Sequence, residues 1–242
     1  MSSFNKDSLY AQPVSDLAPF AFDGKVAAVF TDMIQRSVPG YALSLQLIGI
    51  CADRYVQAGS RVYDLGCSLG AASQAVRAGT TTPHQLIAID QSPEMVTACR
   101  EHLQATAESP VELQCADVRD VPIEDASLVI LNFTLQFIPP TDRAHLLTRV
   151  YHGLRPGGVL VLSEKIQAPT EHQDQRWIDL HHRFKRLQGY SALEISQKRA
   201  ALDAVLIPET AAQHQTRLND LGFASVDPIL QCLNFCTLLA VK

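Results

Sequence analysis

The chain has 242 residues, of which 47% are apolar and 19% charged, so it can bury the core of one α/β domain and is not typical of a disordered protein. Its net charge of −5 argues against a nucleic-acid surface, because phosphate binding needs clustered cations. It lacks an apolar run of the roughly 20 residues that span a bilayer, and its N-terminus lacks the features of a secretion signal. We therefore expect a cytoplasmic protein with no direct contact to nucleic acid or membrane.

The first third of the sequence predicts two helices before the first strand. Residues 1–24 contain Pro13, Pro19 and Gly24 and predict an irregular arm. Helices are predicted over residues 25–35 and 41–56, with a break at Pro39-Gly40. These helices precede the first strand and could close over a ligand.

A strand–helix alternation follows. Strands are predicted over 61–66, 85–90, 111–116, 128–133 and 158–164, and helices over 70–78, 92–106 and 141–153. Ser92-Pro93-Glu94 is a favourable helix start, and Arg155-Pro156-Gly157-Gly158 predicts a stop and turn before the last of these strands. Such alternation indicates a mostly parallel sheet with helices on both faces.

After Glu164 the pattern changes. Residues 166–188 and 191–220 predict consecutive helices, the second opened by a capping box from Ser191 to Glu194. Two apolar segments, 229–235 and 237–241, predict an antiparallel C-terminal hairpin. We expect one domain over 1–242, with an N-terminal helical arm over about 1–58 and a helical insertion over about 166–220.

The stretch over residues 62–70 carries the strongest functional signal. An apolar strand ends in a turn of small residues, Gly66-Cys67-Ser68, and a second apolar strand ends at Asp90, twenty residues after Gly70. Small residues let the backbone approach a ligand, and an acid at that place accepts hydrogen bonds from both ribose hydroxyls. We favour this role for Asp90 over capping of the next helix. The pattern predicts a nucleoside-binding βαβ unit.

Other strand ends supply weaker candidates. Asp117 could accept a hydrogen bond from a purine's exocyclic amine, although a lone acid is more often an ordinary loop residue. Asn132 ends an apolar strand, so its amide needs partners, and a ligand's amino group is one candidate. The planar guanidinium of Arg199 suits a bidentate carboxylate clamp, whereas most helix arginines are only solvated.

The histidines, cysteines and basic residues exclude several site types. The six cysteines are scattered without a C-x-x-C pair, which favours free cysteines in a reducing compartment. His181-His182 is the only histidine pair and adjacent residues do not share a helix face, so we expect no metal site. The dense basic cluster Arg183, Lys185 and Arg186 is interpreted as a solvated helix face.

Two other enzyme classes fit the turn less well. Residues 66–70 match the G-x-S-x-G nucleophile elbow of hydrolases. That mechanism needs a histidine near the final strands, and the last histidine, His214, comes before them. The G-x-G-x-x-G glycines of nicotinamide dehydrogenases are absent.

Residues 30–41, 63–72, 131–137 and 193–199 closely resemble the carboxy-S-adenosyl-L-methionine synthase family, which has the class I, Rossmann-like methyltransferase fold. The resemblance covers residues 20–242 and leaves the arm free to differ. Two positions depart from the pattern. Ser68 replaces the middle glycine of the superfamily's turn, and Gln91 stands where the family usually has asparagine.

The resemblance implies an enzyme that converts S-adenosylmethionine and prephenate to carboxy-S-adenosylmethionine and phenylpyruvate, for wobble-uridine modification in tRNA. It implies a homodimer and no metal. Tyr41 would contact the ligand. The remaining implied contacts are Gly66, Cys67 and Ser68 to the methionine part, Asp90 and Gln91 to the ribose, Asp117 and Val118 to the adenine, Asn132 near the sulfonium, and Arg199 to the added carboxylate.

Two alternatives stay open on the same fold. One is an ordinary methyltransferase for a small molecule or tRNA, which should show a signature such as Asn-Pro-Pro-Tyr after the fourth strand, where this chain has Asn132-Phe133-Thr134-Leu135. The other is a catalytically silent ligand-binding regulator, which needs no second-substrate pocket and gives Arg199 no role.

Overall fold

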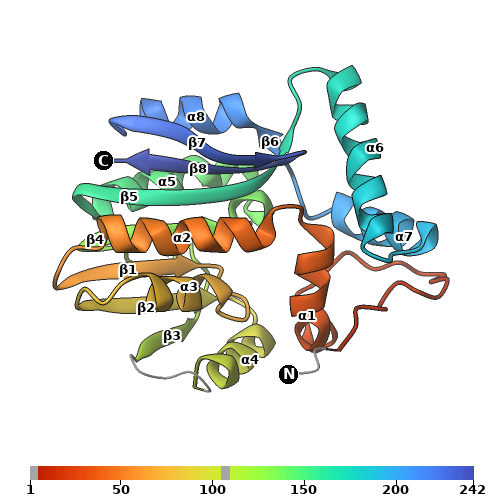
Figure 1. Ribbon diagram of the computed structural model, residues 1–242, viewed down its shortest axis with the longest axis horizontal. Coiled ribbons are helices and arrows are strands. Elements are labelled where there is room, and N and C mark those ends of the chain that lie inside the picture. Colours follow the sequence, from red (N-terminus) through yellow and green to blue (C-terminus); the bar gives the residue numbers. More distant parts are fainter. Residues whose placement is uncertain (1–4, 105–109) are drawn as a thin grey trace.

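One large mixed sheet forms the centre of the computed structural model, which describes residues 5–104 and 110–242 (Figure 1). Its order is β3-β2-β1-β4-β5-β8-β7, with the short β6 paired to the end of β5. The first five strands are parallel, and β7 and β8 form an antiparallel hairpin beside β5. The predicted sheet and hairpin are thereby confirmed. The strands are β1 (Ser60–Leu65), β2 (His84–Asp90), β3 (Val111–Cys115), β4 (Ala126–Asn132), β5 (Leu154–Gln167), β6 (Glu209–Thr210), β7 (Ser225–Cys232) and β8 (Phe235–Val241).

The helices fall into three groups by their place around the sheet. Two precede it, α1 (Gly24–Ser37) and α2 (Tyr41–Tyr55). Four connect or flank strands, α3 (Ala71–Gly79), α4 (Pro93–Gln104), α5 (Pro140–Gly153) and α8 (Ala211–Asp220), and a 3-10 turn, η1 (Leu135–Phe137), follows β4. Two form the insertion, α6 (Glu171–Leu187) and α7 (Ala192–Asp203). The last two residues of the helix predicted over 92–106 lie outside the described part.

The central strands are buried on both faces. In β4, Leu128 and Ile130 pack in one apolar cluster with α2 and α3, whereas Val129 and Leu131 pack in another with α5 and α8. Alternate residues of a strand point to opposite faces, so a strand covered on both sides is apolar throughout. Polar residues are therefore expected mainly at strand ends, and in a parallel sheet these ends share one edge.

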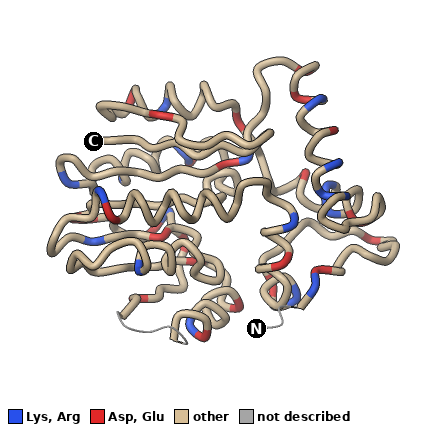
Figure 2. Tube along the Cα trace, viewed as in Figure 1, with Lys and Arg blue, Asp and Glu red and all other residues tan. Residues whose placement is uncertain are grey.

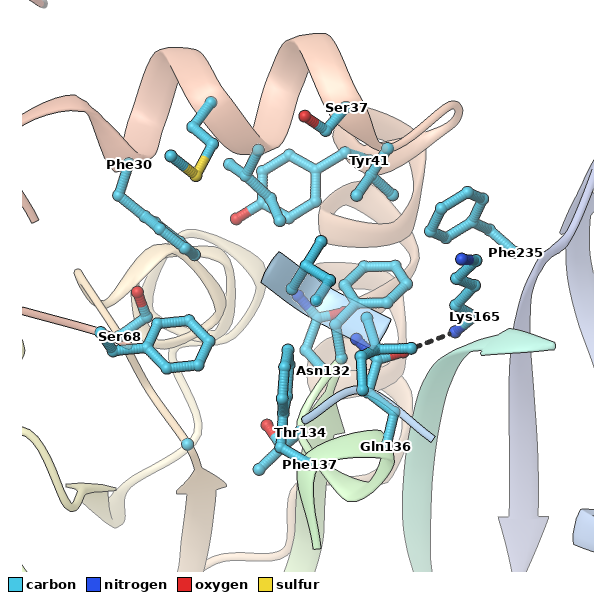
Figure 3. A pocket seen from close by; sticks show the side chains of 18 of the residues that line it. Phe30, Ser37, Tyr41, Ser68, Asn132, Thr134, Gln136, Phe137, Lys165 and Phe235 are labelled. Carbon is cyan, nitrogen blue, oxygen red and sulfur yellow. Dashed lines mark hydrogen bonds between the residues drawn. The ribbon is translucent and has the colours of Figure 1, made fainter. Parts of the chain in front are cut away.

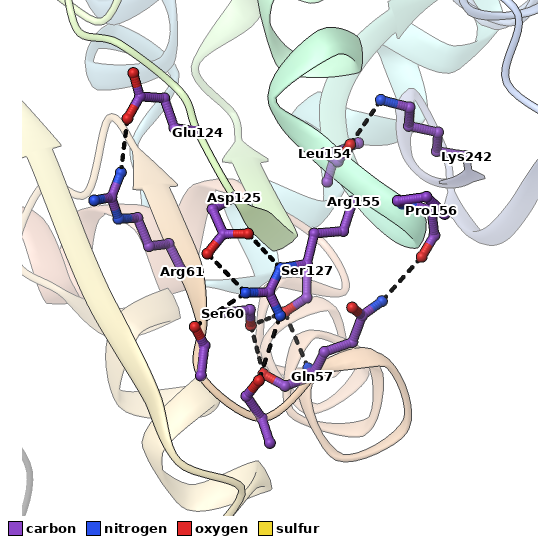
Figure 4. A network of polar contacts seen from close by, with 12 residues as sticks. Gln57, Ser60, Arg61, Glu124, Asp125, Ser127, Leu154, Arg155, Pro156 and Lys242 are labelled. Carbon is purple, nitrogen blue, oxygen red and sulfur yellow. Dashed lines mark hydrogen bonds and ion pairs between the residues drawn. The ribbon is translucent and has the colours of Figure 1, made fainter.

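The turn predicted at residues 155–158 is wrong, because these residues belong to β5. The register between β4 and β5 shifts between Ala126 and Leu128, and Gly157 has a φ of 72°, so a bulge absorbs the Pro-Gly-Gly sequence within the strand. The first residues of β5 are held in place by Arg155, whose guanidinium donates hydrogen bonds of 2.5 and 2.7 Å to the Asp125 carboxylate (Figure 4). The strand is accordingly longer than predicted.

The single helix predicted over 191–220 is also wrong. α7 ends at Asp203, and Pro208, which has no N–H and disfavours helix in the residue before it, lies in the connection to β6. A second capping box, Thr210 with Gln213, then starts α8. Likewise, β7 begins at Ser225, before the predicted hairpin, and continues past Pro228 because it is an edge strand with a register shift there.

The insertion, α1 and the N-terminal arm gather at the carboxyl edge of the parallel strands (Figure 1). Arg143 of α5 connects this region to the sheet. It is fully buried, donates to the carbonyls of Ile138 and Ile207 at 2.9 and 2.7 Å, and pairs with Glu209 of β6 at 2.7 Å. These contacts hold the segment around Ile207 in place.

We predict that Arg143→Met lowers the free energy of unfolding by about 3 kcal/mol, because it removes the ion pair of a fully buried guanidinium with Glu209 and its hydrogen bonds to two carbonyls. Urea denaturation measures the loss. Arg61→Met is the control, since the Arg61–Glu124 pair is exposed and its removal should leave the midpoint almost unchanged. Equal midpoints for both variants would contradict the role of Arg143.

Candidate active site

A cavity of about 1150 Å³ lies at the carboxyl edge of the sheet, between the strand ends and α1, α2, α6 and α7. Figure 3 shows part of its lining, with Tyr41 from α2 facing Asn132 from β4. The structure brings every residue of the predicted site to this one cavity, namely Tyr41, Gly66, Cys67, Ser68, Asp90, Gln91, Asp117, Val118, Asn132 and Arg199. Their individual roles remain predictions.

The turn after β1 is fastened to β2 by its own amides. The N–H groups of Gly66 and Cys67 donate to the carbonyl of Ile89 at 2.8 and 2.9 Å, and that of Ser68 donates to the Asp90 carboxylate at 2.9 Å. These three N–H groups are therefore already hydrogen-bonded. A backbone contact from this turn to a ligand must use the carbonyl oxygens of the turn. Carbonyls suit a ligand's ammonium group.

Two residues of this turn have left-handed backbone. Gly66 has a φ of 82°, and a Cβ there would lie 2.4 Å from the side-chain oxygen of Thr134, so only glycine fits. Ser68, where glycine is usual, has a φ of 50°. A side chain in this conformation costs roughly 1 kcal/mol relative to glycine. The hydrogen bond to Asp90 offsets part of that cost.

Asp90 has room for two further donors. One carboxylate oxygen accepts from Ser68 and the other from the amide of Ser92 at 2.9 Å, and each retains a lone pair. Burial raises its pKa, whereas the backbone hydrogen bonds lower it. The cap of α4 is Ser92, whose hydroxyl accepts from Met95 at 3.1 Å. This geometry is compatible with two ribose hydroxyls.

Three buried oxygens on the cavity lining, in Asp64, Asn132 and Asn234, lack partners among the described residues. Asp64 accepts from the amide and hydroxyl of Ser73 with one carboxylate oxygen, at 3.0 and 2.7 Å, and its other oxygen has none. The side-chain oxygen of Asn132 is likewise unpartnered. Burial raises the pKa of Asp64 to about 6. Such acceptors favour a ligand with donors or positive charge.

Asp64 was not among the predicted site residues. The signal that could have revealed it is an acid inside the apolar strand run from Val62 to Leu65. Neighbouring Tyr41 is buried, and burial together with Asp64 raises the pKa of its hydroxyl, so Tyr41 stays a neutral phenol. Its hydroxyl can therefore act as a hydrogen-bond donor.

The predicted adenine contacts lie in the loop after β3. Asp117 is held by Arg119, whose side-chain nitrogens lie 3.1 and 2.7 Å from one carboxylate oxygen, and these hydrogen bonds lower the pKa of Asp117. Val118 is buried and supplies an apolar wall, whereas Gln91 is exposed. Asp117 is therefore a fixed, ionised carboxylate beside an apolar surface.

Cations line the opposite end of the cavity, on β5, α6 and α7. They are Lys165, Lys185, Lys198 and Arg199, and Figure 2 shows the basic residues along the two helices. The prediction that the cluster over 183–186 is solvated is correct for Arg183 and Arg186 but wrong for Lys185, which is only 7% exposed. The helix face that carries Lys185 packs toward the cavity, which local sequence does not reveal.

His181 and His182 of α6 also line the end of the cavity where the cations lie. His181 is buried, and its Nε2 lies 2.7 Å from the carbonyl oxygen of Ser37, so that nitrogen carries the proton. Burial lowers its pKa to about 3, with Lys185 contributing, so the ring is neutral. His181 therefore adds no charge beside the cations.

The N-terminal arm supports the wall that carries Arg199. Asp7 is only 1% exposed and accepts a hydrogen bond of 2.5 Å from the hydroxyl of Tyr190. The Lys198 ammonium lies 3.5 Å from Asp7 and 3.0 Å from the hydroxyl of Ser37. The expectation that the arm is free to differ misses this buried contact.

Three observations concern site types other than a nucleoside pocket. Among residues 5–104 and 110–242, no three His, Cys, Asp or Glu side chains are grouped to hold a metal ion. No helix in the same ranges has the length and apolar character to cross a membrane. All six cysteines lie in the described part and are free.

Comparison with other proteins identifies the fold. A family described as "Methyltransferase domain" matches residues 62–158. The magnesium protoporphyrin IX methyltransferase of Synechocystis superposes with a TM-score of 0.57 at 17% identity, over 84% of this chain and 83% of that one. Human N-acetylserotonin methyltransferase superposes with a TM-score of 0.54 at 17% identity, over 99% and 63%. The predicted class I methyltransferase fold is confirmed.

Curated relatives are similar over nearly their full length. A protein of Trichlorobacter lovleyi is 54% identical over 239 residues, and one of Haemophilus ducreyi is 48% identical over 240 residues, with 98% of each chain covered in both cases. Both are named carboxy-S-adenosyl-L-methionine synthase. With the fold and this identity along the whole chain, the protein belongs to the carboxy-S-adenosyl-L-methionine synthase family.

Proposed function

We propose that the protein converts S-adenosylmethionine and prephenate to carboxy-S-adenosylmethionine and phenylpyruvate. One observation carries the proposal beyond family membership: the unpartnered carboxylate oxygen of Asp64 lies by the strand ends, and four cations line the part of the cavity formed by β5, α6 and α7. Such a division suits a cationic sulfonium compound beside an anionic second substrate.

The acceptor end fits S-adenosylmethionine. Asp90, with Gln91 beside it, is the ribose ligand, and Asp117 with Val118 flanks the adenine. The turn at residues 66–68 and Tyr41 enclose the methionine part. The free oxygens of Asn132 and Asp64 offer partial or full negative charge to the sulfonium and ammonium groups.

The reaction balances without a protein base. The sulfonium acidifies the attached methyl group, and the resulting ylide carbon forms a bond to the carbon dioxide that prephenate loses. Aromatisation of the prephenate ring drives this loss together with the departure of its hydroxide, which takes the methyl proton and leaves as water. The protein's contribution is to orient two ligands and to exclude bulk water.

Three further features belong to this proposal. The product serves as the carboxymethyl donor for wobble-uridine modification by a separate enzyme, so this protein itself binds no nucleic acid. It acts in the cytoplasm. It functions as a homodimer through the insertion, in support of which α6 and α7 expose Leu180, Leu187 and Leu193, with Leu187 85% exposed.

We predict that the protein, incubated with S-adenosylmethionine and prephenate, releases phenylpyruvate and a carboxylated nucleoside in equal amounts. Mass spectrometry should show a product heavier than S-adenosylmethionine by one carbon dioxide, with no S-adenosylhomocysteine. Accumulation of S-adenosylhomocysteine with a small-molecule or tRNA acceptor would instead identify an ordinary methyltransferase, and absence of any turnover would favour a ligand-binding regulator.

Asp90→Ala should weaken S-adenosylmethionine binding by roughly 100-fold, because two charge-assisted hydrogen bonds are worth about 3 kcal/mol. Calorimetric titration measures the affinity. Asp90→Asn keeps an acceptor for the Ser68 turn and should lose less. Asp120→Ala, at an exposed acid of the neighbouring loop, is the control. Unchanged affinity for Asp90→Ala would rule out the ribose role.

Arg199 is exposed at the cavity and has no hydrogen bond or ion pair with the described residues. A guanidinium there repels the sulfonium of the substrate but attracts the carboxylate of the product. Arg199→Ala should therefore weaken binding of the carboxylated ligand by about 2 kcal/mol more than binding of S-adenosylmethionine. Arg199→Lys should recover part of the difference.

Both affinities can be measured by calorimetry, with Arg183→Ala, at an exposed arginine of α6, as the control. Equal losses for the two ligands would show that Arg199 has a structural role and does not bind the added carboxylate.

A further inference from the structure

Lys185 is a buried cation without an anionic partner. It lines the cavity at 7% exposure, and its ammonium group has no hydrogen bond or ion pair with the described residues. The charged groups that act on it are Lys198, Lys165 and Arg199, all of them cations. Burial, followed by these neighbours, lowers the pKa of Lys185 to about 7.

Lys165 of β5 is a second cation without an ion-pair partner among the described residues, and it is half-buried. Its backbone N–H donates to the side chain of Gln136 at 2.9 Å (Figure 3), but its ammonium group forms no hydrogen bond or ion pair within the described residues. Burial and Arg199 lower its pKa, while Asp203 and Asp174 act in the opposite direction. Lys165 and Lys185 thus approach one part of the cavity from different elements.

Lys198 provides the contrast. It is as buried as Lys185, but Asp7 and Ser37 contact its ammonium group. Asp7 of the arm therefore gives the ammonium group of Lys198 an ion-pair partner. Lys185 and Lys165 have no such partner among the described residues. Burial without a partner disfavours the charged form of a lysine, and an apolar side chain of similar size would avoid that cost.

We propose that Lys185 and Lys165 form a carboxylate-binding subsite for the second substrate, distinct from the contact of Arg199 with the transferred carboxyl group. This inference rests on the proposed function and specifies its substrate as a small dicarboxylate. One carboxylate of prephenate is transferred and reaches Arg199. The other stays on the phenylpyruvate product and binds the two lysines.

The proposal can be tested by the kinetics of Lys185→Met, which keeps the length of the side chain and removes its charge. The KM for prephenate should rise at least tenfold, with a smaller change in kcat and no change in the Kd for S-adenosylmethionine. Inhibition by phenylpyruvate should weaken in parallel, because it keeps the carboxylate that the lysines bind. Lys185→Arg should recover part of the loss.

Arg186→Met is the matched control, since it removes one charge from the next, exposed position of α6. Lys165→Met repeats the test from β5. Lys185→Met should also raise the melting temperature, because it removes a buried cation that the neighbouring cations repel, and a raised melting temperature shows that the variant folds. An unchanged KM for prephenate in both Lys185→Met and Lys165→Met would overturn the subsite while leaving the proposed function intact.

A binding measurement separates the two proposals. S-adenosylhomocysteine lacks the methyl group that is carboxylated, so prephenate can be titrated by calorimetry onto the protein saturated with this compound without reaction. Binding to the original protein but at least tenfold weaker binding to Lys185→Met supports the subsite even if no turnover is found. Equal binding to both proteins would overturn it.

Discussion

The position of the site follows from the burial of β1, β4 and β5 on both faces of the sheet. Such strands have no solvent-facing side, so a polar side chain within them lacks water and needs a specific partner. Asp64 and Asn132 lie at or near strand ends, and each has an oxygen without a partner in the part of the chain that the structure describes. Because the strands are parallel, these oxygens meet at one edge, where a ligand can supply what the fold leaves unsatisfied.

The two ends of the cavity have different structural origins. The acceptors come from the sheet and its loops, which are common to the methyltransferase fold. The cations Lys185 and Arg199 come from the insertion, and Lys165 comes from the extended end of β5 that leads into it. Under the proposed function, the insertion adds an anion-binding surface to a nucleoside-binding scaffold. On that proposal, the insertion rather than the scaffold suits the cavity to carboxyl transfer.

Local sequence was sufficient for the elements that depend on near neighbours. The parallel strands follow from apolar runs, and the turn at residues 66–70 with Asp90 follows from spacing alone. The end of one helix and the start of the next around Pro208 could also be predicted from the sequence, because the Thr210–Gln213 capping box follows this proline closely. The error there came from extending a helical pattern through residues that end helices.

Long-range packing determined what the sequence could not show. Lys185 lies in a basic run that is normally solvated, and its burial depends on how α6 meets the sheet edge. Asp7 contacts Lys198, 191 positions along the chain, so no local pattern reveals the pair.

The same packing has an energetic consequence under the proposed function. Cations that repel one another in the free protein are neutralised when a dicarboxylate binds, and the sulfonium of the first ligand attracts that anion across the cavity. Because linkage is reciprocal, each ligand then raises the affinity for the other. The charges that destabilise the insertion in the free protein thereby favour the productive pair of substrates over either one alone.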